Sequence, residues 1–206
     1  MRYILVTGGA GYIGSTVTNL LLKNNYKVIV VDNLSTGYKF LINKNSKFFQ
    51  VDLRNYKKLK KILSNYNFDA VFHFAASLSV EESEKKPLKY FNNNVLGTEN
   101  ILKIASRFKI KNFIFSSTCA VYGNVLKKSG KINETSQTIP ESNYGKTKLL
   151  CEVLIKNYAK KFNFNYAILR YFNVIGADIN IKSGQVSGST LFKNLSKNIV
   201  KKKYKL

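Results

Sequence analysis

The chain has 206 residues and lacks the features that would place it in a membrane or on a secretory route. No apolar run approaches the roughly 20 residues that a membrane-spanning helix needs. The apolar start in MRYILVTGG is too short for a signal sequence, and glycines interrupt it. From these absences we expect no membrane partner and, by default, a cytoplasmic location.

Cysteine and histidine are too scarce and too scattered to predict a metal site. Cys119 and Cys151 have no metal-ligand spacing and no partner motif, so we interpret both as reduced cysteines in or near the core. His73, the only histidine, stands among apolar residues, a position typical of a hydrogen-bonded core histidine rather than a catalytic one. We therefore predict that the protein binds no metal.

Acidic residues and arginines are also few, and the formal net charge is +23. Such a charge suggests nucleic acid or an anionic membrane as a partner. However, phosphate and base-edge recognition favours clustered arginine, and nearly all of the positive charge here is lysine. The only arginines are Arg2, Arg54, Arg107 and Arg170. Because the lysines are spread over every predicted helix, we predict no nucleic-acid partner, although the basic surface can attract anionic substrates.

The chain alternates short β-branched runs with longer helical ones. Six runs are typical of strands, at 2–8, 27–33, 47–53, 69–76, 111–118 and 165–176. Four runs between them are typical of helices, at 12–25, 57–66, 87–108 and 142–162. Near-continuous apolar strands that alternate with helices predict an α/β fold with a parallel sheet covered on both faces. Ligands of such sheets bind at the carboxyl ends of the strands.

Several local details of this pattern can be compared with a structure. Helix 12–25 has a set of apolar positions at Val17, Leu20, Leu21 and Leu22. Pro87 lies in the opening turn of helix 87–108, and Ser142 is a candidate N-cap of helix 142–162. From about Asp178 the chain changes character, because loop-forming residues lead into a basic, helix-like stretch over 191–206.

The first strand is followed by a glycine-rich motif, VTGGAGYIGS, that opens the first helix. Gly9, Gly11 and Gly14, which follow Gly8, satisfy the dinucleotide fingerprint G-x-G-x-x-G. In this pattern the first glycine makes the tight turn, the second lets the backbone approach a pyrophosphate, and the third lets the helix pack on the strand. The helix N-terminus then faces the phosphate charge. The motif therefore predicts a bound dinucleotide.

An acidic residue at the end of the second strand indicates which dinucleotide is bound. Asp32 lies about twenty residues beyond the glycines, where a carboxylate accepts hydrogen bonds from the ribose hydroxyls of NAD and repels the extra phosphate of NADP. No arginine replaces it, and Asn33 follows. Asp52 ends the third strand in the same way, where it could reach the adenine or cap the next helix. We predict NAD as the cofactor.

Two segments match the pattern Tyr-x-x-x-Lys, and their neighbours distinguish them. Tyr144 and Lys148 lie on one face of a predicted helix, where the ammonium stabilises a phenolate and lowers the pKa of the phenol. The strand before them ends in Ser116-Ser117-Thr118, whose hydroxyls can hold a substrate oxygen and relay its proton. Tyr56 and Lys60 have the same spacing but no such strand end, so we interpret them as a solvated helix face.

Taken in order, eight segments resemble the extended short-chain dehydrogenase/reductase family and, within it, the UDP-glucose 4-epimerases. These segments are TGGAGYIGS, DNLSTG, HFAAS, KPLKYFNNNVLGT, FIFSST, AVYG, YGKTK and LRYFNVIGA. The resemblance implies a Rossmann-type doubly wound sheet over residues 1–177 that holds NAD. It also implies that residues 178–206 are the beginning of a smaller C-terminal substrate domain.

The resemblance further implies roles for individual residues. Tyr144 would be the base, Lys148 its partner and a ribose ligand, and Thr118 the hydroxyl at a position that is commonly serine. Thr118, Tyr144 and Asn173 would contact the sugar nucleotide. The remaining cofactor-binding positions would be Gly8, Gly11, Tyr12, Ile13, Gly14, Asp32, Asn33, Asp52, Leu53, Phe74, Ala75, Asn93 and Tyr171.

The reaction implied by the resemblance is the 4-epimerisation of a UDP-hexose, UDP-glucose or UDP-galactose, in galactose and nucleotide-sugar metabolism. NAD stays bound, takes hydride from C4 of the sugar to give a 4-keto sugar, and returns it to the opposite face. By analogy with the family, we expect a homodimer that forms through the two long helices that start near Pro87 and Ser142.

Other functions stay open at this point. Dehydratases of the same family place an acidic pair after the hydroxyl of the fifth strand, where this chain has Cys119 and Ala120, so dehydration is disfavoured. Leu78 and Thr190 replace residues that contact the cofactor or substrate in some epimerases. The residues that size the sugar pocket lie largely beyond Leu206, which leaves a UDP-N-acetylhexosamine or UDP-pentose epimerase possible. A truncated, non-catalytic NAD-binding protein is the alternative from another class.

Overall fold

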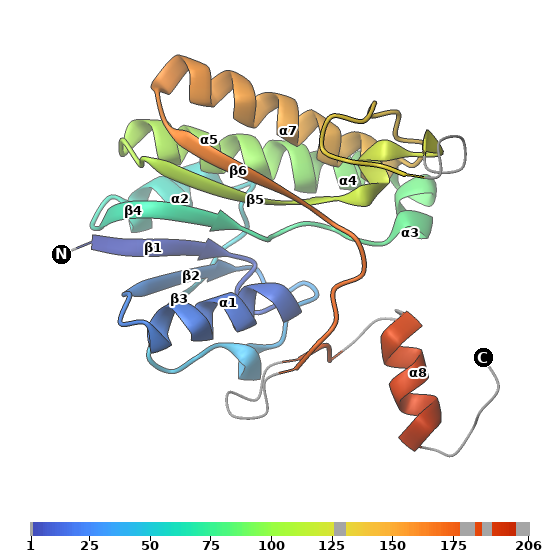
Figure 1. Ribbon diagram of the computed structural model, residues 1–206. Coiled ribbons are helices and arrows are strands. Elements are labelled where there is room, and N and C mark those ends of the chain that lie inside the picture. Colours follow the sequence, from blue (N-terminus) through green and yellow to red (C-terminus); the bar gives the residue numbers. More distant parts are fainter. Residues whose placement is uncertain (1, 126–130, 178–183, 187–190, 201–206) are drawn as a thin grey trace.

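The computed structural model describes residues 2–125, 131–177, 184–186 and 191–200. Six strands form one parallel sheet in the order β3-β2-β1-β4-β5-β6 (Figure 1). Their bounds are β1 Arg2–Thr7, β2 Val28–Asp32, β3 Lys47–Gln50, β4 Asn67–His73, β5 Asn112–Thr118 and β6 Asn165–Tyr171. This is the strand order of the dinucleotide-binding α/β fold, in which the order reverses between β1 and β4. The predicted doubly wound parallel sheet is confirmed.

The helices also follow the predicted alternation. They are α1 Tyr12–Lys23, α2 Tyr56–Leu63, α3 Val80–Lys85, α4 Pro87–Tyr90, α5 Gly97–Arg107, α7 Asn143–Phe162 and α8 Leu191–Val200. Two short 3-10 helices, Lys39–Leu41 and Cys119–Tyr122, and helix α3 were not predicted from the sequence. Ser142 caps α7 by accepting a hydrogen bond from the backbone N–H of Gly145 at 3.0 Å, as predicted.

The predicted helix over 87–108 is interrupted in its hydrogen-bonding pattern. A π-helical segment, Phe91–Leu96, lies between α4 and α5. A π-helical turn inserts a residue and changes the direction of the side chains that follow, and such turns often occur at functional sites. Here the segment contains the three asparagines 92–94 and lies against α7. The sequence predicted the extent of this helix but not its local winding.

Two apolar clusters cover the sheet. The larger cluster packs α2, α5 and α7 on one face, around fully buried residues such as Leu63, Ile101 and Ile155 (Figure 1). The smaller cluster joins α1 to the opposite face through Leu21 and Leu22. In the part of the chain that is described, this second layer does not reach β6, where Leu169 is 37% exposed. The prediction of a sheet covered on both faces therefore holds for the strands near β1 but not for β6.

The most deeply buried residues of helix α1 are small or polar. Its buried residues are Gly14, Ser15, Thr18 and Asn19, whereas Leu20 is 57% exposed. The reason is close packing, because α1 begins against the glycine loop and only small side chains fit there. Of the apolar positions noted in the sequence, Leu21 and Leu22 pack against the smaller cluster, whereas Leu20 faces solvent.

Two sequence predictions lie at the end of the chain. The domain boundary between residues 177 and 178 falls at the start of a segment outside the described residues, and it stays a prediction. Thr190 also lies outside them. Throughout the described ranges, no helix has the length and apolar character needed to cross a bilayer. The cytoplasmic location remains a sequence-based expectation.

The core contains the imidazole ring of His73, whose hydrogen bonds define its tautomer. The Thr98 hydroxyl donates to the Asn94 carbonyl oxygen at 2.6 Å, so it accepts from Nε2–H of His73 at 2.9 Å. Nδ1 of His73 then accepts from the Thr7 hydroxyl at 2.6 Å. The ring also stacks on Phe115. The structure thus supports the interpretation of His73 as a hydrogen-bonded core residue.

We predict that His73 makes the fold less stable as the pH falls below neutrality. Burial, with the Lys148 charge as a second cause, lowers the pKa of His73 from 6.5 to about 3. Within this window the unfolded chain binds a proton that the folded chain does not, so the free energy of unfolding rises with pH. We expect urea unfolding to show a loss of about 2 kcal/mol between roughly pH 7.5 and pH 5.

Because His73 is the only histidine, a substitution gives a direct control. A folded His73→Gln variant should be less stable at neutral pH but should lack this pH dependence. Equal free energies of unfolding at the two pH values in the unmodified chain would contradict the prediction.

Candidate active site

The loop between β1 and α1 holds the glycine motif in a tightly packed turn. Gly8 has φ of +73°, and a Cβ atom there would lie 2.6 Å from the backbone nitrogen of Ala75. A Cβ atom on Gly14 would lie 2.2 Å from the carbonyl oxygen of Gly8, which agrees with its predicted role in helix packing. The sequence assigned the tight turn to Gly9, but Gly8 holds the left-handed conformation. That assignment is therefore corrected.

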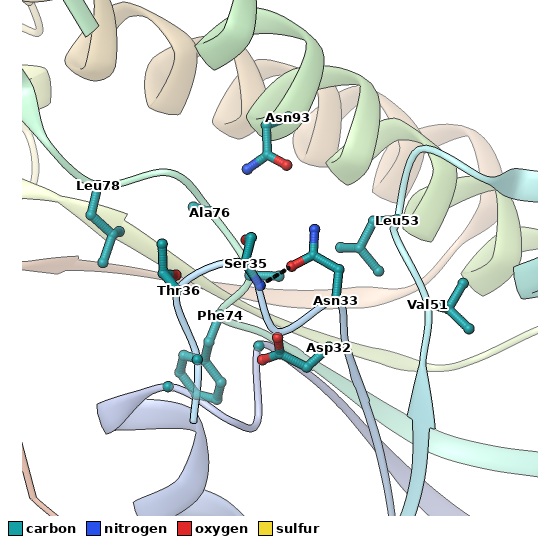
Figure 2. Close-up of a pocket in the computed structure, with 14 residues that line it drawn as sticks. Asp32, Asn33, Ser35, Thr36, Val51, Leu53, Phe74, Ala76, Leu78 and Asn93 are labelled. Atoms are coloured by element: carbon teal, nitrogen blue, oxygen red, sulfur yellow. Dashed lines mark hydrogen bonds between the residues drawn. The ribbon is translucent and has the colours of Figure 1, made fainter. Parts of the chain in front are cut away.

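A pocket opens beside this loop, at the carboxyl end of the sheet (Figure 2). The empty space within it is about 600 Å³, which includes space open to solvent. Loops that follow β1, β2, β3 and β4 converge on it, together with the π-helical segment. Its lining residues are Gly8, Gly11, Asp32, Asn33, Ser35, Thr36, Gly37, Val51, Leu53, Phe74, Ala75, Ala76, Leu78 and Asn93.

Asp32 lies in this pocket with its carboxylate held by backbone amides. One oxygen, Oδ2, accepts from the N–H of Ala10 at 3.0 Å, and the other, Oδ1, accepts from the N–H of Leu34 at 2.8 Å. The side chain is 8% exposed. Each carboxylate oxygen has a second lone pair, so the group can still accept from a ligand hydroxyl. Asp32 is therefore oriented before any ligand binds.

Asp52 is engaged by protein groups rather than by the pocket. Its carboxylate forms a bidentate pair with Arg54, through Nε at 2.9 Å and Nη2 at 2.7 Å, and accepts from Asn33 at 3.1 Å. The Arg54 hydrogen bond holds the pKa of Asp52 well below its usual range. Asn55, not Asp52, caps α2, which answers one of the two sequence-based alternatives. Contact between Asp52 and a cofactor stays a prediction.

The remaining predicted cofactor residues lie around the same edge of the sheet. Tyr12 and Ile13 line an adjoining pocket together with the glycine loop. The Tyr12 hydroxyl donates to the carbonyl oxygen of Gly176 at 2.6 Å and so connects α1 to the segment that follows β6. Leu78 is 65% exposed and lines both pockets, so it gives this edge an apolar side chain.

The structure brings the three predicted catalytic residues together. Thr118 ends β5, and α7 carries Tyr144 and Lys148 one turn apart. Tyr144 is 8% exposed and Lys148 is 2% exposed. The Lys148 ammonium lies 4.5 Å from the centre of the Phe115 ring, a cation–π contact. Tyr144 and Lys148 are thus nearly enclosed by protein.

Burial shifts the pKa of both members of this pair. It raises the pKa of the Tyr144 phenol, while a hydrogen bond with the Thr118 hydroxyl opposes that rise. Burial lowers the pKa of Lys148 from 10.5 to about 8, and the nearby Cys151 and Glu152 act in the opposite direction. A lysine that titrates near working pH, beside a phenol, is suited to proton transfer. In the absence of a further positive charge, Tyr144 is in its protonated form at neutral pH.

The first turn of α7 is fixed by a segment that the sequence did not connect to it. The backbone N–H of Tyr144 donates to the Ser83 hydroxyl at 3.0 Å, and that of Asn143 donates to Glu84 at 2.7 Å. Both acceptors lie on α3, which follows the pocket loop after β4. Two of the unpaired N-terminal amides of α7 are thereby satisfied. Helix α3 consequently positions Tyr144.

Asn94 is a second residue whose part in the site was missed. Its side-chain carbonyl accepts from the N–H of Ser77 at 2.8 Å, and its amide donates to Thr147 at 3.2 Å. It therefore connects the pocket loop to α7, whereas its neighbour Asn93 lines the pocket. In a run of three asparagines, only the register of the π-helical segment decides which side chain faces which way. The sequence offered no signal for that register.

The remaining sequence predictions concern Tyr171, Asn173 and the second Tyr-x-x-x-Lys pair. Tyr171 ends β6 and is paired with Thr118 across the sheet. Asn173 is exposed on the segment that leaves β6, and its substrate contact stays a prediction. The second Tyr-x-x-x-Lys pair lies on α2, in the helical layer, where Tyr56 packs partly against the core. Only the pair on α7 adjoins a strand-end hydroxyl.

The pocket residues fit a dinucleotide. Cβ atoms at Gly8 and Gly14 would meet backbone, which keeps this loop free of side chains, and α1 begins after Gly11, which has no side chain to cap it. Asp32 provides an oriented carboxylate at the position that contacts a ribose. For a metal the result differs: the described residues include no cluster of three or more His, Cys, Asp or Glu side chains that could hold one.

Comparison with known proteins gives consistent matches. The family model described as the NAD dependent epimerase/dehydratase family matches residues 4–205. A UDP-glucose 4-epimerase of Halalkalibacterium halodurans is 41% identical over 88% of this chain and 54% of its own length. A probable UDP-arabinose 4-epimerase of Arabidopsis thaliana is 42% identical over 90% of this chain and 47% of its own. The chain therefore spans about half the length of these curated relatives.

A solved structure of UDP-glucose 4-epimerase from Brucella ovis, in complex with NAD, superposes with a TM-score of 0.83 at 39% identity. The match covers 90% of this chain and 56% of the other. The matched family is described as NAD dependent, and the Brucella ovis structure holds NAD, so NAD is the cofactor of the matched family. The chain belongs to the NAD dependent epimerase/dehydratase family.

Proposed function

We propose that the protein is an NAD-dependent 4-epimerase of a UDP-hexose, UDP-glucose or UDP-galactose, and that this chain supplies its cofactor site and proton-transfer residues. The observation that carries the proposal is the enclosure of Tyr144, Lys148 and Thr118 at the same sheet edge as the glycine cradle. Several relatives are named UDP-glucose 4-epimerases, which supports this sugar class.

The chemistry follows from the positions of these side chains. The Tyr144 phenolate takes the proton from the sugar 4-hydroxyl, and the Lys148 ammonium stabilises the phenolate. The Thr118 hydroxyl holds the same sugar oxygen. Bound NAD supplies the hydride acceptor that turns the alcohol into a 4-keto sugar, and later the hydride donor. When the keto sugar presents its other face, Tyr144 returns the proton and the inverted alcohol forms.

The proposal extends to the assembly of the protein. Leu88 is 76% exposed, and Phe91, Leu150 and Val153 are each 45–47% exposed. They lie on the two long helical segments through which we expect a second copy to bind. Burial of apolar side chains on these helices would stabilise a homodimer.

Two alternatives are kept because particular observations favour them. The relative named as a UDP-arabinose 4-epimerase is as similar to this chain as the UDP-glucose enzymes, which favours testing UDP-pentoses and UDP-N-acetylhexosamines as well. The chain spans about half of its curated relatives, which favours testing NAD binding without turnover. Incubation with each UDP-sugar, followed by chromatography of the products, decides among them. A protein that retains NAD but converts none of these sugars would support the non-catalytic alternative.

We predict that Tyr144→Phe lowers epimerase turnover by roughly 10²–10⁴-fold, because the variant keeps the ring but has no group to exchange the proton. Bound NAD, measured by its release on denaturation, should be unchanged. The matched control is Tyr56→Phe, which alters the tyrosine of the second Tyr-Lys pair on α2. Equal activity of the Tyr144→Phe variant and the unmodified protein would rule out this mechanism.

We further predict that Asp32→Asn weakens NAD binding by about 10- to 100-fold, because it removes a charged acceptor from the ribose. The loss should be smaller for NADP, whose extra phosphate no longer meets a carboxylate, so the preference for NAD should fall. Fluorescence titration with both dinucleotides measures this change. Asp69→Asn is the control, because Asp69 pairs with Arg2 at the opposite end of the sheet. An unchanged preference in Asp32→Asn would refute the assignment.

A further inference from the structure

The proton-transfer face of α7 continues into a buried carboxylate that the mechanism above does not use. Glu152 follows Lys148 by four residues, so it lies one turn further along the same face. Its exposure is 0%. A fully buried carboxylate costs several kcal/mol unless protein groups compensate its charge. Its partners therefore indicate what the residue does.

Glu152 is held by both of the last two strands. Its Oε1 accepts from the Ser117 hydroxyl at 2.5 Å and from Nε of Arg170 at 3.0 Å. Its Oε2 accepts from Nη2 of Arg170 at 2.7 Å, which completes a bidentate ion pair. Ser117 and Arg170 are paired across β5 and β6. The Glu152 side chain thus joins α7 to β5 and β6 at one register position of the sheet.

The arginine of this pair is itself fixed. Its Nη1 donates to the Tyr122 hydroxyl at 3.0 Å, and its guanidinium lies 4.8 Å from the centre of the Tyr122 ring. Tyr122 belongs to the 3-10 helix that directly follows Thr118. Ser117 directly precedes Thr118. Glu152 is therefore linked to residues on both sides of Thr118 in the sequence, to Ser117 directly and to Tyr122 through Arg170. On α7, Glu152 lies one turn from Lys148.

The charge of Glu152 also bears on Lys148. The titratable groups that act on this ammonium are His73 on β4 and Cys151 and Glu152 on α7. His73 is neutral at working pH, and burial raises the pKa of the Cys151 thiol, so that it too is neutral. Tyr144, on the same helix, is protonated at rest. Among these groups around Lys148, Glu152 carries the negative charge, and the Arg170 guanidinium partly neutralises it.

We propose that Glu152, held by Arg170 and Ser117, is a positioning residue that sets Lys148 against Thr118 and keeps the buried Lys148 ammonium charged. The inference rests on the proposed function, because it assigns Glu152 a part in that proton transfer. It differs from a structural role in one respect. A residue that only holds the helix would affect stability, whereas this residue must also affect the titration of Lys148.

The test is an NMR titration of the chain labelled with ¹³C at the lysine ε-carbons. The signal of Lys148 is identified by its absence in Lys148→Met, and it should titrate well below the exposed lysines. In Glu152→Gln, which keeps the shape but removes the anion, we expect the Lys148 pKa to fall by roughly one unit. In Arg170→Gln, which leaves Glu152 without its balancing cation, we expect the Lys148 pKa to rise.

The opposite signs are what separate the proposal from general damage to the fold. Glu99→Gln on α5 is the matched control, because Glu99 forms a surface pair with Lys103 at 2.8 Å and should leave Lys148 unchanged. If Glu152→Gln does not fold, the rise in Arg170→Gln decides. If neither variant folds, Ser117→Ala decides. We expect it to raise the Lys148 pKa less than Arg170→Gln does, because it removes only one hydrogen bond from the Glu152 carboxylate. Folded variants whose Lys148 titrates like the unmodified chain would overturn the proposal.

Turnover provides the second measurement. In protein that epimerises a UDP-sugar, Glu152→Gln should lower kcat and shift the pH profile of kcat, with KM little changed, because the variant alters proton transfer rather than sugar binding. If the unmodified protein converts no UDP-sugar, the proposed function fails, while the titration still tests Glu152. If it converts sugar and the pH profile of Glu152→Gln is unmoved, the inference fails and the proposed function stands.

Discussion

The burial of charged side chains on one face of α7 is the constraint on which the rest of the site depends. Lys148 and Glu152 occupy successive turns and are almost inaccessible to solvent. Such charges are tolerated only when protein groups replace their hydration. The replacements come from Phe115, Ser117 and Arg170, which belong to β5 and β6. The helix can therefore dock in one register only, and that register brings Tyr144 to the end of β5.

A second constraint acts on the cofactor side of the sheet and is linked to the first. The glycine loop packs so closely on the loop after β4 that a Cβ atom at Gly8 would meet backbone. The loop after β4 then reaches α7 by two routes, through Ser83 on α3 and through Asn94 in the π-helical segment. The glycine loop and the Tyr144–Lys148 pair are consequently parts of one packed unit. Side-chain hydrogen bonds of Ser83 and Asn94 fix their relative placement.

Periodicity and turn chemistry were enough to predict the sheet, its main helices and the cofactor class. These features depend on local pattern, such as the apolar run of β2 that ends at Asp32. The misses have another cause, because they depend on packing between segments far apart in sequence. The small residues of α1 are buried by the close approach at Gly14, the pair of Glu152 and Arg170 joins α7 to β6, and Asn94 is selected by a π-helical register. No single window of sequence contains those contacts.

The division of labour within the site follows from where its groups lie. Hydride and proton exchange need a dinucleotide, a phenol, an ammonium and a hydroxyl, and the described residues provide a place for each. Under the proposed function, discrimination among sugars needs contacts to the sugar ring, and Asn173, the residue expected to make one, is exposed on the segment that leaves β6. In the proposed reaction, a site that holds the reacting hydroxyl firmly and the rest of the ring loosely would permit the ring to turn over between the two hydride transfers. The choice of sugar in that reaction would then depend on contacts other than those of Tyr144, Lys148 and Thr118.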